Sequence, residues 1–246
     1  FISKLGTTSL AAVALAFPIL MITQQMAFGA LGGAVTSSIA RSIGAGDTKR
    51  AEKLLWHSLL IASCGAVVFL LAFLLGGESL LKILGGKGPL LEESLSYCMI
   101  FLTGGILIWL SGSLSAALRG MGNMRYPAML MSISSGMQVI LSGGFILGWF
   151  GFPKLGIAGA AVSALASGGF MSLMMFLKLS SSSSKINLKI SRFSFEKELF
   201  KDILDVFLPA SLAPVFTVGT VLVLTGLVGQ FGTTALAGYG IGSRVE

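Results

Sequence analysis

The sequence is poor in charged residues and in the residues that usually carry catalysis in water. Only 11% of its 246 residues are charged, whereas about one quarter of a typical soluble domain is charged. Its one histidine, His57, and its two cysteines, Cys64 and Cys98, form no CxxC or HExxH motif. These absences argue against a soluble domain, a disulfide framework, a metal site and an enzyme.

Charge is absent from six long windows that are rich in hydrophobic residues. The windows cover residues 5–40, 54–77, 94–118, 126–153, 155–177 and 206–243. Each is longer than the roughly 20 residues with which a helix crosses about 30 Å of hydrocarbon, and none alternates like a barrel strand. Because a chain in lipid must satisfy its own backbone hydrogen bonds, we predict an all-α polytopic membrane protein with six spanning helices.

Basic residues are unevenly distributed among the segments that join these windows. Segments 41–53, 119–125 and 178–205 together hold twelve Lys and Arg residues, whereas the two other connections and the segment before the first window hold four. The positive-inside rule therefore places the three basic segments in the cytoplasm. This topology accounts for the net charge of +7, so nucleic acid is not an expected partner.

A short internal repeat suggests that the chain comes from a two-lobed protein. Leu5–Ala11 (LGTTSLA) recurs 226 residues later as Phe231–Ala237 (FGTTALA), with five of seven positions identical. Both copies precede an inward-running helix, and six predicted spans separate them. An even number of spans per repeat gives parallel repeats of like orientation, an arrangement in which some transporters place a substrate path between two halves.

The longest polar connection separates the two predicted lobes. It contains the serine run Ser180–Ser184, which is typical of a flexible linker. We therefore assign residues 1–178 to most of an N-terminal lobe, 179–200 to a cytoplasmic linker, and 201–246 to the start of a C-terminal lobe. An amphipathic stretch at 193–203 fits either a helix on the membrane surface or a solvated lead-in to the next span.

Three glycine-rich segments mark boundaries between predicted spans. They are Ala40–Asp47 (ARSIGAGD), Leu118–Pro127 (LRGMGNMRYP) and Leu155–Ala161 (LGIAGAA). In order, spacing and sidedness they resemble the multidrug and toxic compound extrusion (MATE) family, over essentially the whole chain. The resemblance implies a MATE-like two-lobe bundle of twelve helices, of which this chain would hold helices two to seven and the start of helix eight.

The resemblance also implies an activity. MATE proteins are secondary antiporters that expel organic, often cationic, compounds in exchange for Na⁺ or H⁺ by alternating access. We therefore expect a multi-pass protein of the plasma or inner membrane that acts as a monomer on small organic substrates. Such a protein is not an enzyme and needs no cofactor beyond its coupling ion. The alternative is a flippase of lipid-linked sugars, which would need cationic residues in its cavity; the spans before Arg244 contain none.

Ion coupling in such an antiporter needs a carboxylate within the membrane. At two positions where relatives in the family carry an acid, this chain has Thr217 and Ser142, and neither side chain titrates near neutral pH. Glu246 is then the candidate coupling group, unless the acid lies in helices outside this chain. It is expected about 15 Å into the eighth helix, two residues after Arg244.

Polar side chains in otherwise apolar spans mark the predicted substrate path. Gln24, Gln25 and Gln138 carry amides that must find partners away from lipid. The many methionines on the same helices suit either an adaptable cavity or a lipid-facing stripe. The predicted substrate or ion pathway therefore comprises Gln24, Gln25, Gln138, Thr217, Arg244 and Glu246.

Basic side chains also lie at the predicted cytoplasmic ends of the spans. We interpret Arg41, Arg119 and Arg125 as anchors at the lipid headgroups rather than as ligands. His57 lies one turn inside its span, where an imidazole can lie at headgroup level; a proton relay is the alternative.

Overall fold

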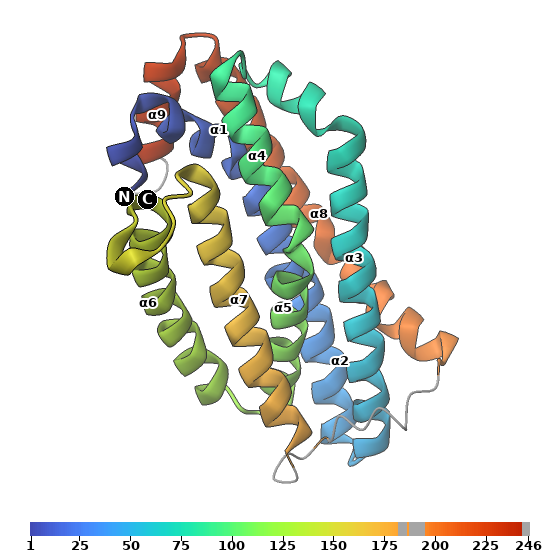
Figure 1. Ribbon diagram of the computed structural model, residues 1–246. Helices are drawn as coiled ribbons and strands as arrows, with labels where there is room; N and C mark the ends of the chain where they lie inside the picture. Colours follow the sequence, from blue (N-terminus) through green and yellow to red (C-terminus); the bar gives the residue numbers. More distant parts are fainter. Residues whose placement is uncertain (182–185, 187–194, 243–246) are drawn as a thin grey trace.

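The structure is a computed structural model, and it describes residues 1–181, 186 and 195–242. Over this range it is a bundle of helices that contains no strand (Figure 1). In chain order the elements are η1 (Ile2–Leu5), α1 (Thr7–Gln24), the π-helix η2 (Gln25–Leu31), α2 (Gly32–Gly44), α3 (Thr48–Ile83), α4 (Pro89–Thr103), α5 (Gly105–Gly120), α6 (Arg125–Leu147), η3 (Trp149–Gly151), α7 (Ile157–Ser180), α8 (Lys197–Gly229) and α9 (Thr233–Gly242).

Five helical segments of the described chain are long and apolar enough to cross a membrane, and a bent pair supplies a sixth. The five are Thr7–Gly44, which joins α1, η2 and α2, and the single helices α3, α6, α7 and α8. The pair consists of α4 and α5, which meet at an angle of 47°. The prediction of an all-α protein with six spans is confirmed when this pair counts as one span.

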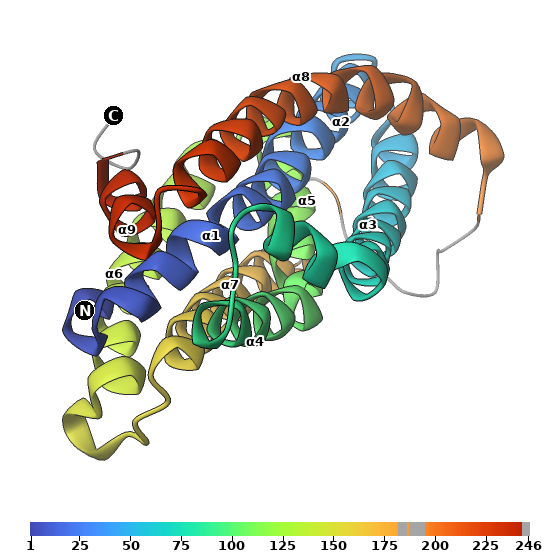
Figure 2. The ribbon, with the colours of Figure 1, turned by 90° about the horizontal axis from the view of Figure 1, so that it is seen from above.

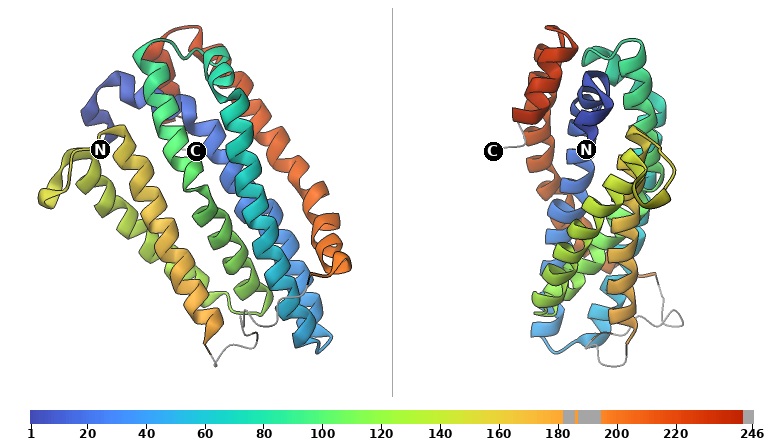
Figure 3. Two further views of the ribbon diagram at one scale, coloured as in Figure 1. Left: turned by 45° about the vertical axis from the view of Figure 1, so that its right-hand side comes forward. Right: turned by 60° about the vertical axis from the view of Figure 1, so that its left-hand side comes forward.

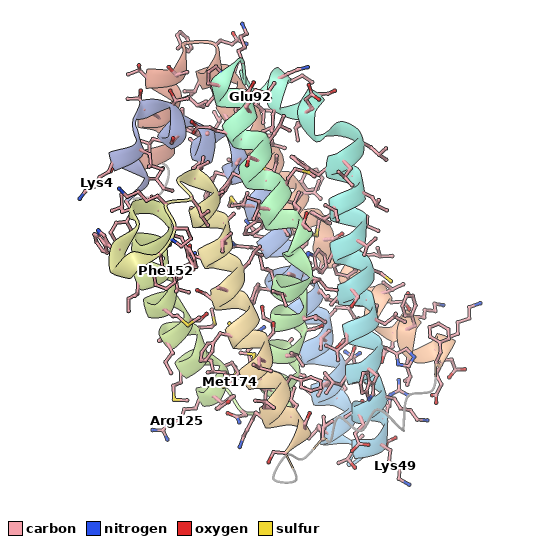
Figure 4. The ribbon with its side chains drawn as sticks, in the orientation of Figure 1. Lys4, Lys49, Glu92, Arg125, Phe152 and Met174 are labelled. Carbon is pink, nitrogen blue, oxygen red and sulfur yellow. The ribbon has the colours of Figure 1, made fainter. Side chains whose placement is uncertain are left out.

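The helix ends fall into two groups, as the charge pattern predicts. Lys49 and Arg125 lie at one end of the bundle, whereas Lys4 and Glu92 lie at the other (Figure 4). The α2–α3 and α5–α6 turns are at the first end (Figure 1). Because these turns belong to the basic segments, that end is cytoplasmic by the positive-inside rule, and we call the opposite end the outer end.

The motifs that carry the family resemblance form turns between helices. Gly46 and Gly122 have φ angles of 76° and 84°, which disfavour any residue with a side chain. Asp47 caps α3, because its carboxylate accepts a hydrogen bond of 2.8 Å from the Arg50 amide. Backbone geometry therefore accounts for the glycines and the aspartate of these motifs.

Small residues let the central helices approach one another closely. A Cβ at Gly112 on α5 would lie 2.7 Å from the Ala27 carbonyl oxygen, and one at Gly120 would lie 2.9 Å from that of Thr36. Thr36 donates its hydroxyl to the Ala116 carbonyl oxygen at 3.1 Å across the same contact. Lipid is as apolar as the helix surfaces, so close packing and interhelical hydrogen bonds of this kind hold the helices together.

The last long helix, α8, runs along α1 and α2 on the side opposite α4 and α7 (Figure 2). In Figure 3 it forms one edge of the bundle, and α6 and α7 form the other. It remains one helix although Pro209 and Pro214 lie inside it. From Lys197 onward the amphipathic stretch belongs to this helix, and Leu199 and Ile203 are buried against the bundle. The lead-in interpretation therefore fits better than a separate surface helix.

The predicted linker overlaps helices at both of its ends. α7 continues to Ser180 and α8 begins at Lys197, so residues 179–200 include the last turn of one helix and the first turn of the other. Most of the serine run and residues 187–194 lie outside the described residues. The division into lobes stays a prediction.

Both ends of α8 are attached to the rest of the bundle. At the cytoplasmic end, Asp202 pairs with Arg41 at 2.9 Å and with Arg50 at 3.1 Å. Arg41 therefore joins two helices through a carboxylate, a role that the headgroup-anchor interpretation had not foreseen. At the outer end, Gly229 packs so closely on the α3–α4 turn that a Cβ would collide with the Leu84 carbonyl oxygen.

The buried side chain of His57 connects α3 to the residues that lead into α8. Its Nδ1 lies 2.7 Å from the Lys53 carbonyl oxygen, and its Nε2 accepts the Glu196 amide at 2.9 Å. Because a backbone amide only donates, Nε2 carries no proton and Nδ1 is the donor to Lys53. Lys53 also forms an ion pair with the Glu196 carboxylate. The imidazole is thus enclosed by protein rather than exposed at headgroup level.

We predict that His57→Phe destabilises the protein. Phenylalanine keeps an aromatic ring at this position, but both hydrogen bonds would be lost, and an unsatisfied buried group costs about 1–3 kcal/mol. The measurement is the midpoint of thermal unfolding of purified protein in detergent, with Cys64→Ala at an exposed position of α3 as the control. Equal midpoints for His57→Phe and the parent would contradict this role.

We also predict that Gly112→Leu prevents close packing of α5 against η2. Overpacking of a tight contact typically costs about 1–3 kcal/mol, and here the clash is with backbone. Gly136→Leu is the matched control, because a Cβ at Gly136 on α6 meets no atom within 4 Å. Size-exclusion chromatography should show aggregation or loss of the folded peak for Gly112→Leu alone.

Candidate functional site

Two neighbouring cavities lie between the α1–η2 segment and helices α4 to α7. The outer cavity, of about 660 Å³, is lined by residues of the chain start, α1, η2, α4, α6 and α7. The inner cavity, of about 570 Å³, lies nearer the cytoplasmic end and is lined by α1, η2 and α4 to α7. Volumes of this size suit drug-sized organic molecules.

The three glutamines predicted for the substrate path line both cavities. Gln24 ends α1, Gln25 begins η2, and Gln138 comes from the middle of α6. The structure therefore brings together residues that lie more than a hundred positions apart. Within the described part of the chain, no hydrogen bond involves the side-chain amides of these three glutamines, so their donors and acceptors are available to bind a ligand.

The π-helix η2 gives the α1–η2–α2 segment a local irregularity beside the cavities. It contributes Phe28 and Gly29 to the wall of the inner cavity. Single π-helical turns inside α-helices often occur at functional sites. Nothing in the hydrophobic pattern of residues 5–40 marks this turn, because a π-turn changes hydrogen-bond register without changing composition.

Serine hydroxyls pair α6 with α7 along the same walls. Ser134 donates to the Ser167 carbonyl oxygen at 2.8 Å, and the hydroxyls of Ser142 and Ser163 lie 2.8 Å apart. Ser142 is one of the positions where the family resemblance led us to look for an acid. In this chain that position forms a neutral hydroxyl pair instead.

The structure does not bring Thr217, another predicted pathway residue, to these cavities. Thr217 is exposed on α8 and lines neither of them. Arg244 and Glu246 lie outside the described residues. Their proposed roles therefore stay predictions.

Among the cavity residues that sequence reasoning missed are Arg119 and Tyr97. Arg119, interpreted as a headgroup anchor, lines the inner cavity, and its Nε is buried without a hydrogen-bond partner among the described residues. Tyr97 lines the outer cavity. The position of Arg119 directly after a charge-free window was a signal that it could lie near membrane depth.

Six apolar spans arranged around cavities that contain a few polar side chains define a multi-pass membrane protein. Comparison with known proteins gives the family. The MatE family model matches residues 1–143, and the chain belongs to this family. The recognition of a MATE-type chain from its three motifs is thereby confirmed.

The chain is similar to several curated transporters along its whole length. It is 28% identical over 260 residues to the FAD transporter of Shewanella oneidensis, covering 100% of this chain and 54% of that protein. It is 29% identical over 252 residues to the probable multidrug resistance protein NorM of Thermotoga maritima, covering 100% and 53%. The chain thus spans about half the length of the curated relatives it matches.

Solved structures of MATE transporters share the fold. One described as the inward-facing conformation of a multidrug resistance MATE family transporter matches with a TM-score of 0.91 and 30% identity, over 99% of this chain and 55% of that one. Another described as the outward-facing conformation of such a transporter matches with a TM-score of 0.77 and 30% identity, over 97% and 59%. These relatives are described as an FAD transporter, a probable multidrug resistance protein and multidrug resistance MATE family transporters, and they give no support to the flippase alternative.

If the glutamines line a wetted cavity, cysteines in their place should react with water-soluble reagents. We predict that Gln138→Cys, with Cys64 and Cys98 replaced by alanine, reacts with a charged thiosulfonate at least about tenfold faster than Val139→Cys, because reaction requires the thiolate. Val139 is exposed on α6 but lines neither cavity, which makes it a matched control. Equal rates at the two positions would show that Gln138 faces no aqueous space.

Proposed function

We propose that the protein is a secondary active antiporter that exports small organic compounds in exchange for Na⁺ or H⁺ by alternating access. The observation that carries this proposal is the pair of cavities within the membrane-spanning bundle, into which three amides converge. Membership of the MatE family supports the same activity. Relatives of this chain include proteins described as an FAD transporter and as a probable multidrug resistance protein.

The cavity walls suit substrates of varied shape. Phe28 and Phe101 offer flat apolar surfaces, while Met131 and Met171 offer flexible thioethers that adapt to different ligands. The family resemblance implies that substrates are often cationic. A cationic substrate would need a carboxylate from elsewhere, because no Asp or Glu is among the residues that line the two cavities in the described part of the chain.

We further propose that the described conformation corresponds to an inward-facing state. The inner cavity lies toward the cytoplasmic end, where Arg119 contributes to its wall. The higher similarity to the structure described as inward-facing, 0.91 against 0.77, supports this assignment. In this state the cavity would receive substrate from the cytoplasm, as export requires.

Coupling requires a group that exchanges H⁺ or binds Na⁺, and we propose Glu246 for that role. Ser142 is held in a neutral hydroxyl pair and Thr217 cannot titrate near neutral pH, so neither position supplies a carboxylate. An intramembrane acid is costly to hold charged and can therefore link ion binding to a conformational preference. An acid in a segment beyond this chain is the alternative source. A monomer remains the proposed working unit.

The test is efflux of a fluorescent organic compound, either the cation ethidium or the anion flavin mononucleotide, from vesicles that contain the full-length protein, under an imposed Na⁺ or H⁺ gradient. We expect gradient-driven efflux from the parent and a loss of at least about tenfold in rate for Glu246→Gln, which cannot exchange a proton. Glu92→Gln, at an exposed position of the outer end, is the control for loss of one negative charge.

Three outcomes separate the parts of this proposal. No gradient-driven efflux of either compound by the parent would contradict the antiporter itself. Unchanged efflux by Glu246→Gln would assign coupling to another carboxylate. A gradient of one ion that drives efflux while the other does not would identify the coupling ion.

A further inference from the structure

Arg119 occupies a position in the inner cavity that an anchoring role does not explain. It lies in the last turn of α5 and lines the cavity together with the predicted glutamines. Its Nε is buried and lacks a hydrogen-bond partner, and none of the ion pairs found among the described residues includes it. The positive charge is therefore not neutralised by a carboxylate of the described chain.

The guanidinium group is positioned by packing. It crosses the start of α2 beside Gly32, where an added Cβ would lie 3.2 Å from Nη2. That distance is tight for any side chain, so glycine at this position leaves room for the arginine. The guanidinium therefore lies against the start of α2 with no acidic partner among the described residues, and its donors are available to a ligand.

The stretches of chain that line the two cavities contain no acidic residue; the only acids on a lining helix, Glu92 and Glu93, lie in the first turns of α4 at its outer end. No Asp or Glu occurs in residues 1–46 or in residues 94–195, which together contain every residue that lines either cavity. The other polar groups of the inner cavity are amides and hydroxyls, including Gln24, Gln138 and Ser135. These groups can donate hydrogen bonds to an anion, whereas nothing in the wall would balance the charge of a cation.

The acidic residues near the cytoplasmic end belong to a different part of the bundle. Asp47 caps α3, Asp202 pairs with Arg41 and Arg50, and Glu196 pairs with Lys53. These carboxylates lie on the α2–α3 turn and on or just before α8, and the arginine and lysine partners of the last two lie on α2 and α3. The cavity side of the bundle thus keeps a net positive charge.

We propose that the inner cavity binds the carboxylate or phosphate group of an aromatic organic anion, and that Arg119 is the residue that determines this specificity. The planar guanidinium can donate two parallel hydrogen bonds to either group. Phe28, Phe101 and the cavity methionines then cover the apolar body of the ligand. This inference rests on the proposed function, since it names the substrate class of the same cavity.

Riboflavin and flavin mononucleotide test the proposal, because they share one aromatic body and differ by a single phosphate. Binding is measured by equilibrium dialysis with the full-length protein in nanodiscs of zwitterionic lipid, so that no anionic headgroup competes. We expect the parent to bind flavin mononucleotide at least about tenfold more tightly than riboflavin, as hydrogen bonds to a charged group imply. Arg119→Gln should abolish this preference and leave riboflavin binding within about twofold of the parent.

Two further variants separate specificity from structure. Arg125→Gln removes an exposed positive charge five residues after Gly120, outside both cavities, and should keep the preference. Arg119→Lys keeps the charge but loses the planar fork, so it should retain part of the preference.

The results that would overturn the proposal are equally specific. They are no binding of flavin mononucleotide by the parent, equal affinity of the parent for both flavins, or an unchanged preference in Arg119→Gln. Loss of all flavin binding in both Arg119→Gln and Arg119→Lys would show a structural role and would also overturn it. Gradient-driven efflux of ethidium or flavin mononucleotide by the parent is measured separately from binding, so failure of the antiporter proposal is distinguishable from failure of anion recognition.

Discussion

Hydrocarbon offers no hydrogen bonds to a protein backbone, so the membrane-spanning segments of this chain are helices, whose backbone hydrogen bonds form within the segment itself. Side chains follow the same rule. Thr23 donates to the Ile19 carbonyl oxygen and Ser94 to that of Leu90, so isolated hydroxyls are satisfied within their own helix. Longer or more strongly polar side chains are not satisfied by a carbonyl oxygen of their own helix, so they must lie at a cavity or against other polar groups. In this protein Gln24, Gln25 and Gln138 all line the same two neighbouring cavities.

The same constraint explains why so much of the fold could be predicted. Charge-free windows and the bias of basic residues follow directly from the cost of charge in lipid, and they determined the spans and their sidedness. The glutamines could be predicted for the same reason, since a side-chain amide inside an apolar span must find hydrogen-bond partners away from lipid. Residues such as Ser142 and Thr217, by contrast, came from resemblance alone, and only Ser142 lies at a cavity.

Other features depend on contacts that the pattern of a sequence does not encode. The 47° bend between α4 and α5 occurs at Gly104, without a proline, where an added Cβ would overlap Leu165 of α7. The π-helix η2 changes hydrogen-bond register only. The two arginines Arg41 and Arg119 looked alike in sequence, yet Asp202 lies beside one and a cavity beside the other. In each case the deciding neighbour is distant along the chain.

The attachments at both ends of α8 determine how this helix can deform. Ion pairs at Asp202 restrain one end, and the contact of Gly229 with the α3–α4 turn restrains the other. A helix that is attached at both ends resists sliding and tilting, and it deforms most easily by bending between the two attachments. Pro209 and Pro214 lie between these two attachments, and each removes a backbone hydrogen bond that would stiffen the helix. Compliance in α8 is therefore concentrated within the membrane, away from both of its attached ends.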